Sequence, residues 1–276
     1  MTLEDHAGDV VRKARLMLDV PAVDSAGAGK ISLEALTAFE QSGRAPTGID
    51  WDGMARRLDL SGTKLRQLTE GWTPKPVELS TWRELRVITT EGNVMTVNAF
   101  LVWDEATREA ALFDTGFDAT PIFAWIDSEK LNLQHLFITH THGDHVAALE
   151  PIRERYPKLH LHTHAKPAPP QHLNRANDFI QVGSLRISNR ETPGHAEDGV
   201  TYVVGGFPED APHVAVVGDA IFAGSIGGAP GKGGPTRKAI RDQIFTLPGP
   251  TLICPGHGPL STVEEQKRAN PFFAEA

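Results

Sequence analysis

The sequence predicts an α/β fold whose core begins near residue 80, after a small N-terminal helical extension. Two observations support this prediction. From residue 80 onward, short runs rich in Val, Ile and Leu, bounded by Gly and Pro, alternate with helical stretches. The first 72 residues instead repeat their apolar side chains at helical spacing. With 276 residues, the chain can form one large domain, or a large and a small one.

The N-terminal extension, residues 1–72, is predicted to contain four short helices. Ser32 and Ser61 stand where N-caps are expected, each just before an apolar periodic stretch. The expected helices are Val10–Leu18, Ser32–Gly43, Met54–Leu58 and Ser61–Gly71. A stiff Pro-containing linker, Thr73–Pro76, then separates the extension from a domain assigned to residues 80–276.

The last two predicted helices also have the outline of a helix-turn-helix motif, which binds DNA. Four cations are available for phosphate: Arg56, Arg57, Lys64 and Arg66. Nearby acidic residues, such as Asp52 and Asp59, dilute this charge. We therefore expect the helices to serve as a packing cap or an oligomer contact, and keep DNA binding as the alternative.

The core elements follow in order from residue 85. Pro121 after Thr120 starts a helix, the stretch after His145 is helical, and Ser261 with Glu264 predicts a capping box. The succession fits two sheets stacked face to face with helices outside. The predicted strands are Leu85–Thr90, Val97–Trp103, Ala110–Asp114, Leu136–Thr139, Leu159–His162, Leu185–Ser188, Val200–Val204, Val214–Val217 and Leu252–Cys254.

A dense cluster of metal-ligand residue types follows the apolar run Leu136–Ile138. It contains His140, His142, Asp144 and His145. Neutral imidazole and carboxylate are the ligands that a borderline divalent ion such as zinc accepts, and one turn can aim several of them at one point. The spacing lets His140 and His142 reach one ion, while Asp144 and His145 could hold a second ion beside it.

Three further ligand candidates lie at the ends of later strands. They are His195, Asp219 and His257, and each sits on a Gly or Pro-Gly turn after a β-rich stretch. Two buried dications need several anionic or imidazole ligands to offset their charge. The three candidates can complete such a shell.

The region from about Val97 to Phe273 resembles the metallo-β-lactamase superfamily, and within it the glyoxalase II-like branch. The matching motifs are H-x-H-x-D-H at 140–145, T-P-G-H at 192–195, G-D at 218–219 and P-G-H-G-P at 255–259. The resemblance implies an αββα sandwich with two divalent metal ions, zinc first and iron or manganese as alternatives. It implies that His140, His142 and His195 hold one ion, that Asp144, His145 and His257 hold the other, and that Asp219 bridges them. The lactam-cleaving branches lack a carboxylate at the position of Asp219, so antibiotic hydrolysis is disfavoured.

Two metal ions in this arrangement imply a hydrolase in which a bridging hydroxide attacks a thioester, an ester or a lactone. Asp144 is the candidate catalytic residue, because a carboxylate beside the hydroxide can accept its proton. Asp114 matches a position where the family often orients a ligand histidine, with a plain turn aspartate as the alternative. Two other functions stay open: a mononuclear iron persulfide dioxygenase, and a metal-containing regulatory protein.

Glutathione thioesters are the leading named substrates, but one feature of the sequence departs from that pattern. The family tends to place a basic residue nine positions after the bridging aspartate, and here that residue is Gly228. Lys232 or Arg237, on the Gly-rich stretch that follows, could substitute. The histidines of the 160–172 stretch could line the pocket, although a Pro-rich surface loop favours solvated side chains: His160, His162, His164 and His172.

Composition limits the location and the partners of the protein. Cys254 is the only cysteine, so no intramolecular disulfide forms, and the N-terminus has no signal-peptide pattern; we expect a cytoplasmic protein. No apolar run is long enough to span a membrane. The net charge of −8 disfavours a nucleic acid partner. We expect a small-molecule substrate and, through the N-terminal helices, an oligomer contact.

Overall fold

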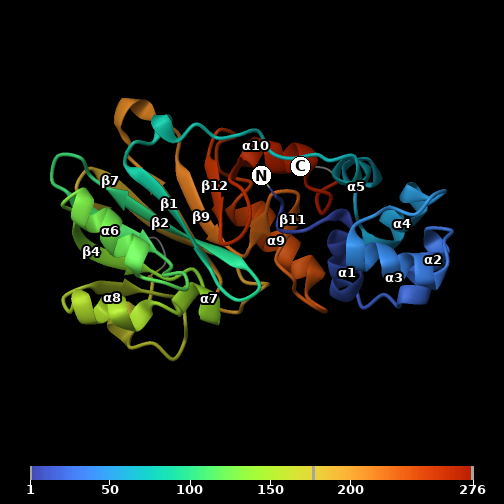
Figure 1. The fold of residues 1–276 in the computed structure, drawn as a ribbon, viewed down its shortest axis with the longest axis horizontal. Coiled ribbons are helices and arrows are strands. Elements are labelled where there is room, and N and C mark those ends of the chain that lie inside the picture. Colours follow the sequence, from blue (N-terminus) through green and yellow to red (C-terminus); the bar gives the residue numbers. More distant parts are fainter. Residues whose placement is uncertain (1, 176–177, 275–276) are drawn as a thin grey trace.

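The computed structural model describes residues 2–175 and 178–274, and Figure 1 shows two stacked sheets with the N-terminal helices at one end. The first sheet has the order β1-β2-β3-β4-β5, and the second β13-β12-β9-β8-β7-β6. The first sheet comprises β1 (Leu85–Glu91), β2 (Thr96–Trp103), β3 (Glu109–Phe113), β4 (Asn132–Phe137) and β5 (His160–His162). The second comprises β6 (Phe179–Val182), β7 (Leu185–Glu191), β8 (Val200–Gly205), β9 (Val214–Gly218), β12 (Leu252–Pro255) and β13 (Ser261–Thr262). A separate hairpin pairs β10 (Ile221–Phe222) with β11 (Ser225–Ile226).

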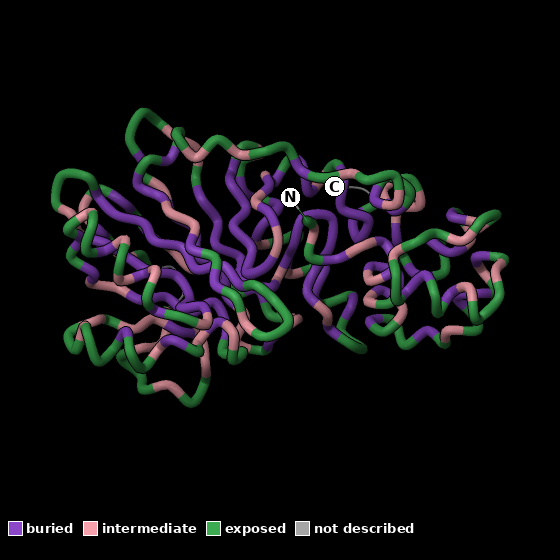
Figure 2. The backbone as a smooth tube through the Cα atoms, in the orientation of Figure 1, coloured by how far each residue is buried: buried purple, intermediate pink, exposed green. Residues whose placement is uncertain are grey.

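Alternation along the strands separates the layers of the sandwich. Ala111 and Phe113 of β3 belong to the apolar core between the sheets, whereas Ala110 and Leu112 belong to the cluster outside the first sheet. Helices α6 (Thr120–Ser128) and α8 (Leu149–Arg155) cover that outer face. Figure 2 shows the strands as the most continuously buried part of the chain. The predicted αββα architecture is confirmed.

The outer face of the second sheet shares one apolar cluster with the N-terminal helices, α9 (Gly233–Gln243) and α10 (Val263–Ala269). Ala215, Val217 and Ile253 of the sheet are buried in this cluster. The amide of Ser61 donates to the carbonyl of Pro271 at 2.8 Å, which ties the extension to the C-terminal segment. The division into residues 1–72 and 80–276 stays a prediction, and residues 1, 275 and 276 lie outside the described part.

In residues 2–72, the described part of the extension, there are five helices rather than the four predicted. They are α1 (Ala7–Met17), α2 (Ala22–Ala28), α3 (Leu33–Ser42), α4 (Trp51–Leu58) and α5 (Gly62–Thr69). Ser32 and Ser61 cap α3 and α5 as expected. Helix α2 escaped prediction because it lacks a side-chain cap and buries only Ser25 and Ala26. Among the residues that the structure describes, no helix has the length and apolarity to cross a bilayer.

Four other expectations need correction. The strand expected at Leu136–Thr139 is β4, which begins at Asn132 and ends at Phe137, because the amide of Thr139 donates to the carboxylate of Asp114 instead of to a strand. Short β6, β10, β11 and β13 were not predicted. The Gly-rich stretch expected after Gly228 folds in part into α9. The capping box lies one residue later than predicted, at Thr262 and Glu265.

Candidate metal centre

A single turn after β4 carries four of the seven predicted ligands. Asp114 adopts a left-handed conformation at φ 55° and accepts hydrogen bonds from the amide and the hydroxyl of Thr139, at 2.8 and 2.7 Å. These bonds turn the chain out of the sheet and place His140 just beyond it. The short helix α7 (Gly143–Val146) then carries Asp144 and His145 back toward the same point.

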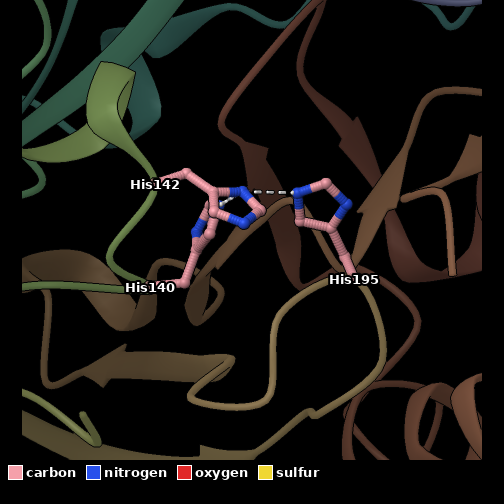
Figure 3. Close-up of side chains that lie close together, drawn as sticks. All are labelled: His140, His142 and His195. Atoms are coloured by element: carbon pink, nitrogen blue, oxygen red, sulfur yellow. Dashed lines mark hydrogen bonds between the residues drawn. The ribbon is translucent and has the colours of Figure 1, made fainter.

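His140, His142 and His195 converge on one point, as Figure 3 shows. Nδ1 of His142 lies 3.1 Å from Nε2 of His140 and 2.9 Å from Nε2 of His195. The Nδ1 of His195 donates to the carbonyl of Gly228 at 3.2 Å, so its Nε2 keeps a lone pair toward the other rings. Three imidazoles with their nitrogens this close can share a cation.

Asp144, His145 and His257 form the second group of potential ligands. An oxygen of Asp144 lies 3.1 Å from Nε2 of His257 and 3.5 Å from Nε2 of His145. His257 donates through Nδ1 to the carbonyl of Thr96 at 2.6 Å, and His145 contacts Asp114 through Nδ1 at 2.8 Å. Both rings are therefore held with Nε2 toward the site, as ligand histidines usually are.

Asp219, at the end of β9, lies between the two groups. Its Oδ1 is 3.3 Å from Nε2 of His145, and its Oδ2 is 3.4 Å from Nε2 of His195 and 3.5 Å from Nε2 of His257. His145 Nε2 and Asp219 Oδ1 are buried without a hydrogen-bond partner in the described part of the chain. Such a pair of buried polar atoms is costly unless a cation binds there. The donor set therefore fits a pair of divalent ions.

Burial and charge shift the protonation of these groups strongly. Burial, with the nearby charge of His145, lowers the pKa of His140 to about 2. Burial also acts to lower the pKa of His145, but the charge and hydrogen bond of Asp114 raise it to about 10. The pKa of His257 is likewise raised against burial to about 9, mainly by Asp219. Without metal, the Asp114 and Asp219 carboxylates therefore favour the protonated forms of His145 and His257, and metal ions that bind there must displace those protons.

The structure decides between the two interpretations of Asp114 and exposes two positioning groups that the sequence did not indicate. Asp114 is 1% exposed and orients His145, so it is no plain turn residue. The backbone carbonyls of Thr96 and Gly228 orient His257 and His195. Carbonyl oxygens leave no signature in a sequence, and both contacts join segments far apart in the chain.

Arg237 and Cys254 do not contribute to the site. Arg237 lies in α9, is 2% exposed and bonds to the carboxylate of Asp59 at 2.5 Å, so the expectation that it meets a substrate carboxylate is wrong. Cys254 is fully buried in β12, and burial raises the pKa of its thiol, which argues against a nucleophilic role. Lys232 is exposed and pairs with Glu197 at 3.3 Å.

The amino-acid sequence is similar to several known proteins. The probable metallo-hydrolase YqgX of Bacillus subtilis is 28% identical over 216 residues, covering 70% of this chain and 97% of the relative. The hydroxyacylglutathione hydrolase GloC of Haemophilus influenzae is 27% identical, covering 64% and 92%. Human mitochondrial persulfide dioxygenase ETHE1 is 29% identical, covering 62% of this chain and 69% of the enzyme.

Solved structures agree with these similarities. The B3 metallo-beta-lactamase BLEG-1 is 26% identical with a TM-score of 0.58, covering 68% of this chain and 99% of BLEG-1. TTHA1623 in a di-iron-bound form is also 26% identical, with a TM-score of 0.51 and coverage of 67% and 100%. The sequence model of the metallo-beta-lactamase superfamily matches residues 92–257, more than half of the chain, and the protein belongs to this superfamily.

Proposed function

We propose that the protein is a dinuclear metal-dependent hydrolase that cleaves a thioester, an ester or a lactone. The single observation that supports this most is the position of Asp219, whose two oxygens face the two histidine groups at 3.3 to 3.5 Å. A carboxylate placed this way can bridge two ions. Similarity to hydroxyacylglutathione hydrolase GloC supports hydrolysis of a thioester in particular.

The proposed ligands are His140, His142 and His195 for one ion, and Asp144, His145 and His257 for the other, with Asp219 between them. Zinc suits this set of imidazole and carboxylate donors, and iron is the alternative supported by the di-iron form of TTHA1623. Two bound divalent ions supply an activated water at neutral pH and positive charge against a developing oxyanion.

The protein's own residues complete the proposed chemistry. Asp144 keeps 17% of its side chain exposed, so it can both contact an ion and accept a proton from the attacking water. Asp114, Thr96 and Gly228 fix the ligand rings before the substrate arrives, which lowers the cost of organising the site. A side-chain nucleophile is not needed in this scheme.

The structure offers little to grip the distant carboxylates of glutathione. A Cβ at Gly228 would meet no atom within 4 Å, so the family's usual basic side chain is replaced by open space. Lys13, from α1, contacts the nearby carbonyl of Ile226 at 3.2 Å, but its charge is paired with Asp5. We therefore propose that the substrate is a small thioester, ester or lactone, and that the site recognises its acyl part.

The decisive experiment combines metal analysis with a substrate panel. Protein loaded with zinc or iron is tested against thioesters, lactones, phosphodiesters and a β-lactam, with Asp219→Ala as the inactive comparison. The proposal expects about two ions per chain and turnover of at least one acyl substrate that the variant loses. Turnover of phosphodiesters alone, or equal activity in the variant, would refute it.

A mononuclear iron dioxygenase is the second candidate. His140, His145 and Asp219 lie within 4.8 Å of one another, and two histidines with one carboxylate form the iron-binding set of many oxygenases. The similarity to human persulfide dioxygenase ETHE1 points the same way. Oxygen consumption with a glutathione persulfide by iron-loaded protein, at one iron per chain, would favour this candidate over hydrolysis.

For the N-terminal helices we propose a packing role rather than DNA binding. Lys64 donates to the carbonyls of Lys267 and Phe273, and Arg57 pairs with Asp24 at 3.1 Å. Two of the four cations expected to contact phosphate are therefore engaged within the protein. A salt-dependent DNA-binding titration tests this, since a genuine binder weakens steeply with added salt.

A further inference from the structure

A second histidine cluster lies on the first sheet, away from the candidate metal centre. β4 and β5 are parallel neighbours, and their register places His135 opposite His160 and Phe137 opposite His162. Nδ1 of His135 lies 3.0 Å from Nε2 of His162. The ring of His160 follows on the other side, with its centroid 5.4 Å from that of His135.

The separation of these two nitrogens is one that a single metal ion can span. At the candidate metal centre, the corresponding distances between histidine nitrogens are 2.9 and 3.1 Å. A tetrahedral zinc ion with Zn–N bonds of about 2.0–2.1 Å holds two nitrogens about 3.3 Å apart. A shift of a few tenths of an ångström would therefore admit an ion between His135 and His162.

The surroundings keep both rings ordered and uncharged. The ring of His162 stacks on Phe137, with centroids 4.5 Å apart and an angle of 17° between the planes. Burial lowers the pKa of His162 to about 3 and that of His135 to about 4, so both rings are neutral at pH 7. One ring then donates to the other across the 3.0 Å contact, and an ion that binds there displaces this shared proton. His162 also lines a cavity of about 200 Å³, together with Tyr202 and Asn174, which leaves room for water ligands.

We propose that His135 and His162 form a separate binding site for a borderline divalent ion such as zinc. The site joins β4 to β5, the three-residue strand at the edge of the first sheet. Binding an ion there stabilises the edge strand, because the ion binds the folded sheet and has no preformed site in the unfolded chain. The site lacks a carboxylate ligand, so we expect it to be weaker than the main centre.

The test counts zinc ions on the zinc-loaded, full-length protein. Wild type, His135→Gln and His162→Gln are equilibrated first in low and then in micromolar free zinc, and metal per chain is measured. The matched control is His213→Gln, which replaces an exposed histidine just before β9 of the second sheet. Equal metal content at low free zinc confirms that each variant is folded and keeps its main centre.

At micromolar free zinc, wild type and His213→Gln should each bind one ion more than at low zinc. His135→Gln and His162→Gln should each lower the affinity for that extra ion at least tenfold and abolish the rise in Tm that its binding causes. The two substitutions lie on different strands, so one remains informative if the other unfolds the sheet. The proposal is overturned if wild type binds no extra ion, or if both pair variants bind it as tightly as wild type.

Discussion

Replacing Asp114 by Asn should lower the affinity for the second metal ion, the one assigned to Asp144, His145 and His257. The fold and the binding of the first ion should be unchanged. Asp114 accepts three hydrogen bonds, from the amide and hydroxyl of Thr139 and from Nδ1 of His145, at 2.7 to 2.8 Å. An asparagine can keep the bond from the backbone amide through its oxygen. Its NH₂ group then faces His145 and donates where the carboxylate accepted.

That reversal changes the tautomer of His145. In the metal-bound state His145 carries one proton, on Nδ1, and if Nδ1 instead accepts from the asparagine, that proton moves to Nε2, which points at Asp219 from 3.3 Å. A protonated Nε2 has no lone pair for a metal. Loss of such an orienting partner typically weakens metal binding about 10–100-fold, which is about 1.4–2.7 kcal/mol. His195 is oriented by Gly228 instead, so the first group should be little affected.

The assay is metal content against chelator-buffered zinc for wild type, Asp114→Asn and Asp127→Asn. Asp127 is an exposed aspartate on α6 that pairs with Arg155, so its replacement controls for the loss of one charge. We expect two binding steps in the control and a 10–100-fold weaker second step in Asp114→Asn. Equal weakening of both steps, or none, would refute the role of Asp114 in orienting His145.

Two further predictions concern the metal centre and its substrate, and one concerns the buried carboxylate of Asp104. Asp219→Ala should lower bound metal to one ion per chain or fewer and abolish hydrolysis; retained activity with two metals would remove its bridging role. Asp104→Ala should lower the free energy of unfolding by roughly 2–4 kcal/mol, because its buried carboxylate accepts bonds from Ala106, Thr107 and Ser184. Those bonds, the one from Ser184 foremost, hold the pKa of Asp104 below its usual value despite burial. The stability that the carboxylate contributes is therefore present above about pH 4 and is lost as the pH falls. Chemical denaturation should show the difference in free energy of unfolding between wild type and Asp104→Asn becoming smaller toward low pH. Finally, kcat/KM should favour S-lactoylglutathione over an equally reactive short acyl thioester by less than about a hundredfold, or about 2.7 kcal/mol, and a larger preference would reveal a cation that grips glutathione.

The ligand-bearing turns could be predicted from the sequence because they are local features. His140 to His145 follow one apolar strand directly, and Gly218 with Asp219 ends another. The ends of neighbouring strands meet at one edge of a sheet, so local patterns brought all seven candidates to one place. Helix α9 and Arg237 were misjudged for the opposite reason. Gly233 and Gly234 are residues typical of a loop, yet α9 begins at Gly233. The start of this helix lies against Met17 of the extension, a long-range contact that the sequence does not show.

The contacts that orient the ligands depend on which distant segments meet, and no local pattern carries that information. Thr96 can hold His257 only because β2 of the first sheet lies beside the turn after β12 of the second. At the same place the backbone amide of Asn98 donates to the carbonyl of Gly256 at 2.7 Å. The extension reaches the same region, since Lys13 of α1 bonds to Ile226 of β11. The next residue is Gly227, where any Cβ would lie 2.7 Å from the Cβ of His195. The helical extension therefore packs against a loop that positions a proposed ligand, and its helices are part of the support of the site.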